Sequence, residues 1–183
     1  GGCKGGLSDI IIGATALAAQ YQGTLGGSHI KDKLTEMTHL AETVYSASVA
    51  CSAMGAKTKS GAYYPDPLLA NCAKHNITRN IYEISRLAHD IAGGIMATLP
   101  FDKDLRSEKI GKYVKKYLAG VKGVSTETRM KVLRLIENMT GGTCLIESMH
   151  GAGSPQAQRI MISRQGNLEQ KKQLAKEIAG IKG

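Results

Sequence analysis

Glu147 is the first residue whose type and setting point to chemistry. It stands in a segment that is otherwise largely apolar, from Cys144 to Met149. A carboxylate that loses water on burial has a raised pKa, which suits a general acid or base in carbon chemistry. The alternative is a structural Glu paired with Lys or Arg at a helix edge. The spacing alone leaves both interpretations open.

The turn that follows Glu147 predicts an anion site. Gly151 and Gly153 precede Ser154 and Pro155, a pair that predicts a helix with a capping hydroxyl and Pro in the first turn. Free backbone N–H groups and the helix dipole favour a phosphate at such an N-terminus. Further donors stand on the first turn of that helix: Gln156, Gln158 and Arg159. A capped turn without a ligand is the alternative.

Cys3 and Lys4 form a third candidate near the start of the chain. Glycines on both sides of this pair allow a bulky group to approach the backbone. A neighbouring Lys favours the thiolate form of a Cys. One Cys cannot hold a metal cluster, so a ligand role requires partners from elsewhere. The alternative is a surface thiol in a flexible terminus.

The other cysteines and the histidines carry weaker signals. Cys51, Cys72 and Cys144 lie in apolar helical pattern, and we expect them to be buried as small hydrophobic residues. The sequence has no CxxC pair, and the spacing predicts no zinc site. The helix around His75 carries a polar face that could contact a cofactor or a neighbouring subunit: Asn76, Arg79 and Asn80.

Helical periodicity dominates the elements that must position these residues, and there is no convincing alternating pattern of a β-strand. The pattern predicts helices at residues 7–20, 28–54, 66–92, 105–119, 125–140, 144–149 and 154–179, a loop at 57–64 and a turn at 100–104. Long helices joined by short loops favour antiparallel neighbours. The expected fold class is therefore all-α, an antiparallel up-and-down helical bundle.

Composition and charge narrow the function. The 183 residues are 42% apolar and 21% charged, as expected of a single domain spanning 1–183. The net charge is +9, but Lys and Arg are scattered and not interleaved with aromatic residues, which argues against nucleic-acid binding. No apolar run approaches transmembrane length, so no membrane partner is expected. An anionic cofactor or a CoA thioester explains the basic excess equally well.

Several segments together resemble the 4-hydroxybutyryl-CoA dehydratase family. They are Gly2–Lys4, Gly26–Leu34, Glu36–Leu40, Leu69–Asn71, Asn76–Arg79 and Glu147–Ile162. The resemblance runs in register to residues 178–182, and 147–162 is its specific part. The wider family includes flavin-dependent 4-hydroxyphenylacetate 3-monooxygenases and has an acyl-CoA-dehydrogenase-like fold, so the resemblance implies a bundle like the C-terminal domain of those enzymes.

This resemblance implies a cytoplasmic homotetramer that holds FAD and a [4Fe-4S] cluster. It also implies a lyase that dehydrates 4-hydroxybutyryl-CoA to crotonyl-CoA and isomerises vinylacetyl-CoA. Cys3 then matches one of the cluster ligands. Glu147 matches an active-site carboxylate, and Lys4 is a weaker catalytic candidate. FAD contacts are expected from the turn and the helix after it: Gly151, Gly153, Ser154, Gln156 and Arg159.

The same resemblance implies that the chain is the C-terminal part of a larger enzyme. The remaining cluster ligands and a catalytic Tyr would precede Gly1, as would an N-terminal helical domain and a middle β-domain. We therefore expect the isolated chain to lack dehydratase activity, whether it is a truncated protein or one subunit of a split enzyme. Two alternatives stay open: a flavin-dependent monooxygenase domain and a helical assembly module without catalysis.

Overall fold

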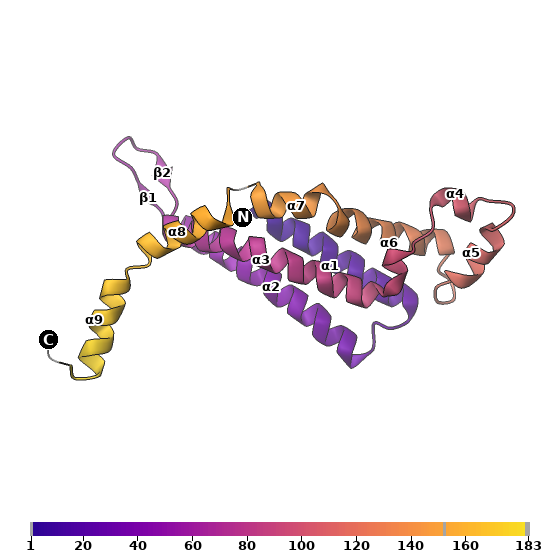
Figure 1. Cartoon of the computed structure of the whole chain (residues 1–183), viewed down its shortest axis with the longest axis horizontal. Coiled ribbons are helices and arrows are strands. Elements are labelled where there is room, and N and C mark those ends of the chain that lie inside the picture. The colour runs from indigo at the N-terminus through magenta and orange to yellow at the C-terminus, as the bar shows by residue number, and fades with distance from the viewer. Residues whose placement is uncertain (1, 152, 182–183) are drawn as a thin grey trace.

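The computed structural model describes residues 2–151 and 153–181, so residues 1, 152, 182 and 183 of the predicted domain lie outside the described part. Long helices that follow one another along the chain run in opposite directions and form a bundle (Figure 1). The bundle helices are α1 (Gly2–Gln22), α2 (Ser28–Ala53), α3 (Pro67–Ala92) and α6 (Thr126–Gly141). The predicted all-α, up-and-down bundle is confirmed.

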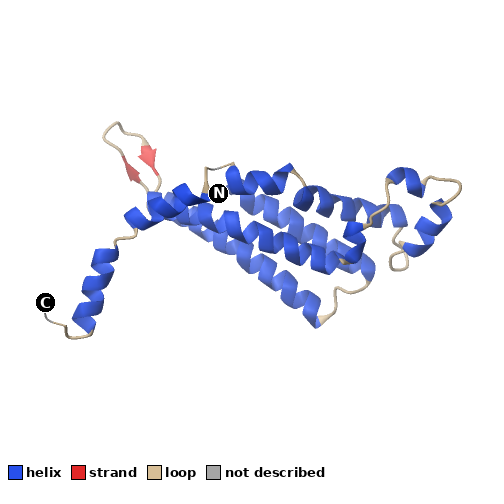
Figure 2. Ribbon diagram, viewed as in Figure 1, coloured by secondary structure: helices blue, strands red, loops and turns tan. Residues whose placement is uncertain are grey.

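Shorter elements complete the described part of the chain (Figure 2). A small antiparallel hairpin, β1 (Ala56–Lys57) and β2 (Tyr63–Tyr64), connects α2 to α3. The shorter helices are η1 (Gly94–Ala97), α4 (Asp102–Leu105), α5 (Gly111–Tyr117), α7 (Thr143–His150), α8 (Pro155–Gln165) and α9 (Leu168–Ile178). α7 and α8 pack against α3, whereas α9 projects from the bundle (Figure 1). Of the described helices, none is long and apolar enough to cross a membrane.

The core lies where the bundle helices face one another. Its largest fully buried aliphatic side chains are Ile11, Met37, Ile81, Ile84, Leu133 and Ile136. α3 supplies much of this surface, because its buried residues recur every three or four positions between Ala73 and Ile91. Full burial of one such side chain stabilises a fold by about 1.5–3 kcal/mol, which is more than local helix propensity contributes at a position.

Side-chain caps fix where three of the predicted helices begin. The Asp66 carboxylate accepts a hydrogen bond from Leu69 N at 2.8 Å, and Pro67 occupies the first turn of α3. The Ser125 and Ser154 hydroxyls accept in the same way from backbone N–H groups in the first turns of α6 and α8. These predicted starts are confirmed.

α1 starts earlier than predicted. It was expected from residue 7, but it begins at Gly2. Ser8, which resembles a cap in the sequence, is buried inside the helix, and its hydroxyl donates to Lys4 O at 2.9 Å. Glycine is a poor helix former, so the first turn depends on packing against α2, where Gly5 faces a tyrosine ring. The early start holds Cys3 and Lys4 on a regular helix.

Two other predicted helices differ from the prediction. The helix expected at 105–119 forms only from Gly111 to Tyr117, as α5, while most of the turn expected at 100–104 is the helix α4, and the chain reverses between the two. A Cβ at the buried Gly111 would lie 2.6 Å from the Leu105 carbonyl oxygen, so this reversal requires glycine. Residues 154–179 break at Asn167, which has a left-handed φ of 42° and caps α9 with its side chain. The β1–β2 hairpin is a third departure, because the sequence pattern indicates a loop there.

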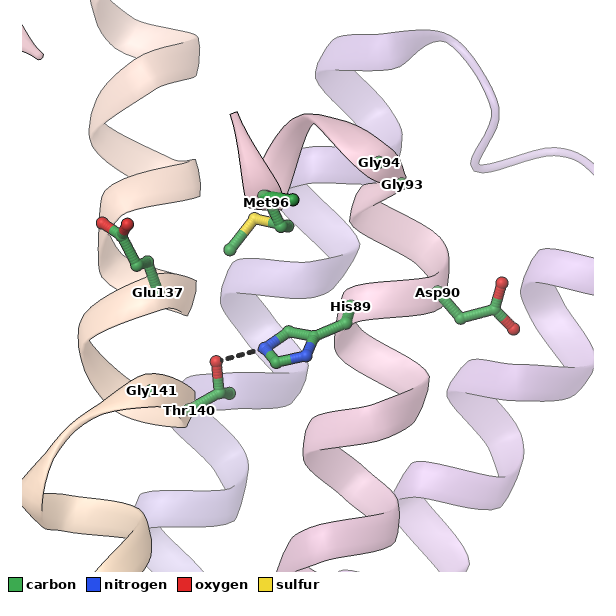
Figure 3. A pocket seen from close by; sticks show the side chains of 9 residues that line it. His89, Asp90, Gly93, Gly94, Met96, Glu137, Thr140 and Gly141 are labelled. Atoms are coloured by element: carbon green, nitrogen blue, oxygen red, sulfur yellow. Dashed lines mark hydrogen bonds between the residues drawn. The ribbon is translucent and has the colours of Figure 1, made fainter. Parts of the chain in front are cut away.

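A hydrogen bond between His89 and Thr140 joins α3 to α6 (Figure 3). His89 Nε2 lies 2.6 Å from Thr140 Oγ1, and the Thr140 hydroxyl also lies 2.7 Å from Ile136 O. The carbonyl can only accept, so the single hydroxyl proton points to Ile136. The hydroxyl therefore accepts from His89, and Nε2 carries the hydrogen.

The cavity beside this hydrogen bond has a volume of about 600 Å³. Its ionised side chains are already paired within the chain. Lys33 Nζ lies 2.7 Å from Asp90 Oδ2, and the hydrogen bond from Lys33 holds the pKa of Asp90 below its usual value. Glu137 pairs with Arg134. Because its Asp and Glu side chains are already in ion pairs, this cavity is a junction between helices and a poor candidate for a catalytic site.

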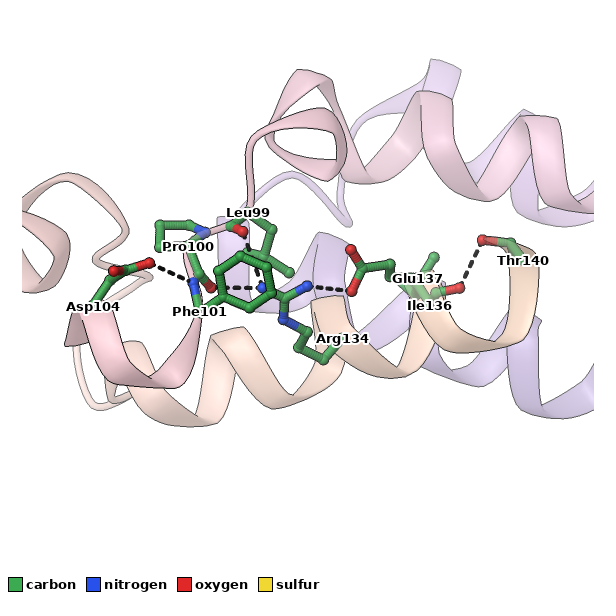
Figure 4. Close-up of polar contacts among 8 residues, drawn as sticks. All are labelled: Leu99, Pro100, Phe101, Asp104, Arg134, Ile136, Glu137 and Thr140. Carbon is green, nitrogen blue, oxygen red and sulfur yellow. Dashed lines mark hydrogen bonds and ion pairs between the residues drawn. The ribbon is translucent and has the colours of Figure 1, made fainter. Parts of the chain in front are cut away.

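Arg134 fastens the segment after α3 to α6 (Figure 4). Its Nη2 donates to Leu99 O at 3.0 Å and to Pro100 O at 2.8 Å, while Nη1 pairs with Glu137. The guanidinium carbon lies 5.0 Å from the centre of the Phe101 ring, which adds a cation–π contact. One planar side chain thus satisfies two backbone carbonyls and stacks on an aromatic ring.

We predict that Arg134→Lys lowers the unfolding free energy of the chain by about 1–2 kcal/mol, because an ammonium keeps the charge but loses the planar fork. Urea unfolding followed by circular dichroism measures this. The matched control is Arg106→Lys, which alters an exposed Arg106–Asp102 pair and should cost less than about 0.5 kcal/mol. Equal losses in the two variants would contradict the assigned role.

Candidate functional site

The chemically distinctive residues of the sequence lie together at one cavity. Cys3 and Lys4 on the first turn of α1 and Glu147 on α7 line a cavity of about 160 Å³. Lys4 Nζ forms an ion pair with Glu147 Oε2. The two helices meet here because the chain bends at Gly142, in extended conformation, and then lays α7 along α3. A thiol, an ammonium group and a carboxylate therefore share one small space.

Glu147 is less buried than its apolar neighbours predict. Its side chain is 50% exposed and is paired with Lys4, whose side chain is 14% exposed. The expectation of a desolvated carboxylate is therefore wrong in this chain, and Glu147 has the Lys partner that the alternative assumed. The reason is that α7 is a short helix on the bundle surface, and Ser148 is its buried residue.

Cys3 is exposed and lines the same cavity. Its sulfur is therefore accessible to a group brought by another polypeptide. Within the described residues there is no group of three or more His, Cys, Asp and Glu side chains that could hold a metal ion. Cys144 is exposed as well, so its predicted burial is wrong, because it lies in the first turn of a short helix on the bundle surface. Cys51 and Cys72 are half-buried.

The predicted anion site forms a second, larger cavity. It has a volume of about 720 Å³ and lies where α3 meets the start of α8. Ser154, Gln156 and Arg159 line it, as predicted, and Arg79 faces them from α3. His75 also lines it, and its Nδ1 atom is buried without a hydrogen-bond partner among the described residues. Two guanidinium groups and a helix N-terminus make this cavity suitable for an anion.

The two cavities share a wall at Thr78 of α3, which lines both. Gly151 lines the smaller cavity. Gly153 shapes the turn instead: its φ of 92° lies in the left-handed region that favours glycine, and its carbonyl accepts from Gln158 Nε2 at 3.2 Å. The residues predicted to bind an anion are therefore gathered around one turn.

Three polar residues of the smaller cavity were not predicted from the sequence: Lys74, Thr78 and Ser148. A signal for two of them was present. Lys74 and Thr78 are one helical turn apart, so they share a face of α3, and polar residues interrupt the apolar stripe of α3 at this end. Ser148 gave no such signal, because a small hydroxyl in an apolar segment is ordinary.

The geometry defines a helical domain with an exposed thiol at one small cavity and a second cavity lined by two guanidinium groups. The chain matches one known protein family over almost its whole length. The model of the family "HpaB: 4-hydroxyphenylacetate 3-hydroxylase C terminal" matches residues 1–180. The chain therefore belongs to the 4-hydroxyphenylacetate 3-hydroxylase C-terminal family.

Two relatives resemble the chain over essentially its whole length. A 4-hydroxybutyryl-CoA dehydratase/vinylacetyl-CoA Δ-isomerase from Clostridium aminobutyricum is 56% identical over 100% of this chain and 40% of its own length. The solved structure of an oxygen-tolerant archaeal 4-hydroxybutyryl-CoA dehydratase from N. maritimus superposes with a TM-score of 0.94 and is 58% identical, covering 99% of this chain and 37% of that one. The resemblance inferred from the sequence is confirmed.

The monooxygenase branch is more distant. The FAD complex of the oxygenase component (HpaB) of 4-hydroxyphenylacetate 3-monooxygenase superposes with a TM-score of 0.81 at 19% identity, over 93% of this chain and 36% of that one. This likeness establishes a common fold. The chain spans about two fifths of the length of the dehydratase relatives it matches, so it corresponds to their C-terminal helical region.

We predict that the Lys4–Glu147 pair responds asymmetrically to substitution. Glu147→Gln leaves a nearly buried ammonium without a carboxylate and should cost about 1–2 kcal/mol of unfolding free energy, whereas Lys4→Met leaves a solvated carboxylate and should cost under about 0.5 kcal/mol. Urea denaturation of each variant measures the difference. The exposed Lys131–Glu127 pair is the control, and neither of its substitutions should exceed about 0.5 kcal/mol. A larger cost for Lys4→Met than for Glu147→Gln would refute the burial argument.

Proposed function

We propose that this chain is the C-terminal domain of a dehydratase that depends on FAD and a [4Fe-4S] cluster. The enzyme removes water from 4-hydroxybutyryl-CoA to give crotonyl-CoA, and it isomerises vinylacetyl-CoA. The observation that carries the proposal is the meeting of Cys3, Lys4 and Glu147 at one cavity. Identity of 56% to the Clostridium aminobutyricum relative over the whole chain supports it.

Glu147 has the chemistry and exposure needed for proton transfer. Its carboxylate sits at the mouth of the cavity, half exposed, where an incoming acyl chain can reach it. In its ionised form it can take a proton from a carbon of the acyl chain, which the thioester activates, and return that proton at another position of the substrate. Lys4 orients that carboxylate through the ion pair. The proposed roles are Glu147 as acid and base and Lys4 as its partner.

Cys3 fits the role of one cluster ligand. A [4Fe-4S] cluster is held by several protein ligands, mostly cysteine thiolates, and Cys3 is exposed at the cavity. The described residues contain no group of three or more His, Cys, Asp and Glu side chains that could hold a metal ion, so the other ligands must come from other polypeptide. When bound, the cluster would supply a Lewis acid for the leaving hydroxyl oxygen. Cys3 would hold this group beside the Glu147 carboxylate.

The larger cavity fits the anionic part of FAD. Arg79, Arg159 and the N-terminus of α8 offer positive charge and free donors, and guanidinium groups bind phosphate in two-pronged fashion. The buried Nδ1 of His75 lacks a partner among the described residues, which a ligand would supply. HpaB oxygenase structures that share this fold are complexes with FAD. We assign Ser154, Gln156 and Arg159 to this cofactor, with the chain contributing only part of its site.

Three further attributes belong to the same proposal. The acyl-CoA substrate and the remaining domains of the enzyme are the partners, since the chain spans 40% of its relative. A homotetramer and a cytoplasmic location complete it.

The monooxygenase alternative has weaker support, because those relatives are 24% identical or less and no described feature of this chain favours oxygen chemistry.

We predict that the chain alone, supplied with iron and FAD, forms no crotonyl-CoA. The assembled enzyme, made by joining this chain to the part of the Clostridium aminobutyricum relative that it does not cover, should form it anaerobically. Crotonyl-CoA formation and bound iron are the measurements.

In the same assembled enzyme, Cys3→Ala should abolish both crotonyl-CoA formation and bound iron by removing a cluster ligand. The control is Cys144→Ala, which removes another exposed thiol and should leave both unchanged. Full iron content in the Cys3→Ala protein would refute the ligand role.

We also predict that Arg159→Gln weakens FAD binding to the assembled enzyme by about tenfold, because one charge-assisted contact to phosphate is lost. Fluorescence titration of the apoprotein with FAD measures the dissociation constant. Arg164→Gln is the matched control, since Arg164 is exposed on the same helix. An equal change in both variants would show that general charge, and not the cavity, governs FAD affinity.

A further inference from the structure

Three polar side chains form a buried wall of the smaller cavity. Thr78 on α3, Ser148 on α7 and Gln158 on α8 all line it. Their exposed fractions are 7%, 3% and 2%, respectively. Burial of polar groups is costly unless each finds a partner. The hydrogen bonds of these three residues therefore indicate what the cavity is built to receive.

Each of the three side chains donates a hydrogen bond to a backbone carbonyl. Thr78 Oγ1 donates to His75 O at 2.8 Å, and Ser148 Oγ donates to Cys144 O at 2.8 Å. A hydroxyl has one proton and two lone pairs. Neither hydroxyl has a further proton for a ligand, so each presents lone pairs alone.

Gln158 repeats this pattern with its carboxamide. Its Nε2 lies 3.2 Å from the carbonyl oxygen of Gly153, and a carbonyl can only accept, so the NH₂ group is the atom on that side. The orientation of the amide is thereby fixed. Its Oε1 is buried and has no hydrogen-bond partner among the described residues. A buried acceptor left unpaired costs about 1–3 kcal/mol.

The wall therefore consists of acceptors, and the rim of the same cavity carries two ammonium groups, Lys4 and Lys74. An anion would be repelled by the acceptors, and a cation by the ammonium groups. A neutral O–H donor suits both. The cavity of about 160 Å³ has room for about five waters at ~30 Å³ each, and so for a short acyl chain.

We propose that Gln158, supported by Thr78 and Ser148, binds the hydroxyl group of the hydroxyacyl substrate. This inference rests on the proposed dehydratase function and names a binding residue for it. The substrate hydroxyl donates its proton to Gln158 Oε1, and its oxygen remains free to be drawn away as the leaving group. Holding the hydroxyl in this way places the adjoining carbons beside Glu147 at the same cavity.

The two reactions of the relatives separate this role from a structural one. Dehydration acts on 4-hydroxybutyryl-CoA, which has the hydroxyl, whereas isomerisation acts on vinylacetyl-CoA, which has none. A residue that binds the hydroxyl affects the first reaction alone. A residue that holds the fold affects both, because the same chain and cofactors serve both.

The test is Gln158→Met in the assembled enzyme, with kcat/KM measured for both reactions. Met keeps the length of Gln and removes the acceptor. Dehydration should fall by about tenfold or more, as when a site built to bond a hydroxyl loses that bond, and isomerisation should stay within about twofold. Gln165→Met is the control, because Gln165 also has a buried Oε1 without a partner on α8 but is not among the residues lining this cavity.

Each outcome decides between the two interpretations. Equal losses in both reactions, or no loss in either, overturn the hydroxyl-binding role. If Gln158→Met fails to retain FAD or helical content, Ser148→Ala and Thr78→Val test the same wall, and each should lower dehydration severalfold more than isomerisation. If the unsubstituted assembled enzyme catalyses neither reaction, the proposed function itself is wrong, and the inference falls with it.

Discussion

The burial of α3 along one apolar face is the constraint on which the rest of the domain depends. α1, α2 and α6 pack on this helix, and α7 and α8 lie against its first half. Its interior residues recur at helical spacing, so its direction and rotation are fixed by the core. The polar residues at its start are fixed at the same time. Lys74, Thr78 and Arg79 thus reach the two cavities from a rigid position, which holds their geometry constant.

The bundle and the site place different requirements on the amino-acid sequence. The HpaB oxygenase component keeps the fold at 19% identity, because a core needs apolar volume in the right pattern more than particular side chains. The dehydratase from N. maritimus is 58% identical. Chemistry belongs to a few side chains at one end of such a scaffold. In this chain the candidates are the thiol, ammonium and carboxylate of Cys3, Lys4 and Glu147, which line one cavity.

Much of the fold follows from local signals in the sequence. Caps and prolines located the starts of α3 and α8, and periodicity gave the bundle helices. The start of α1 was missed because glycine disfavours a helix locally and tertiary packing overrides that preference. The reversal at Gly111 was missed because it depends on a close approach to the Leu105 carbonyl, which no local propensity reveals. Residue chemistry singled out Cys3 and Glu147, but their meeting depends on the bend at Gly142, and the exposure of Glu147 depends on where α7 lies.

The hydrogen bond between α3 and α6 at His89 also has a consequence for how these two helices are aligned. Its Nε2 is the donor to Thr140, since the threonine hydroxyl gives its proton to Ile136. A hydrogen bond forms only when donor and acceptor meet within a narrow range of distance and angle, whereas apolar side chains tolerate other packing arrangements. This polar contact therefore sets the axial position of the last turns of α3 against those of α6.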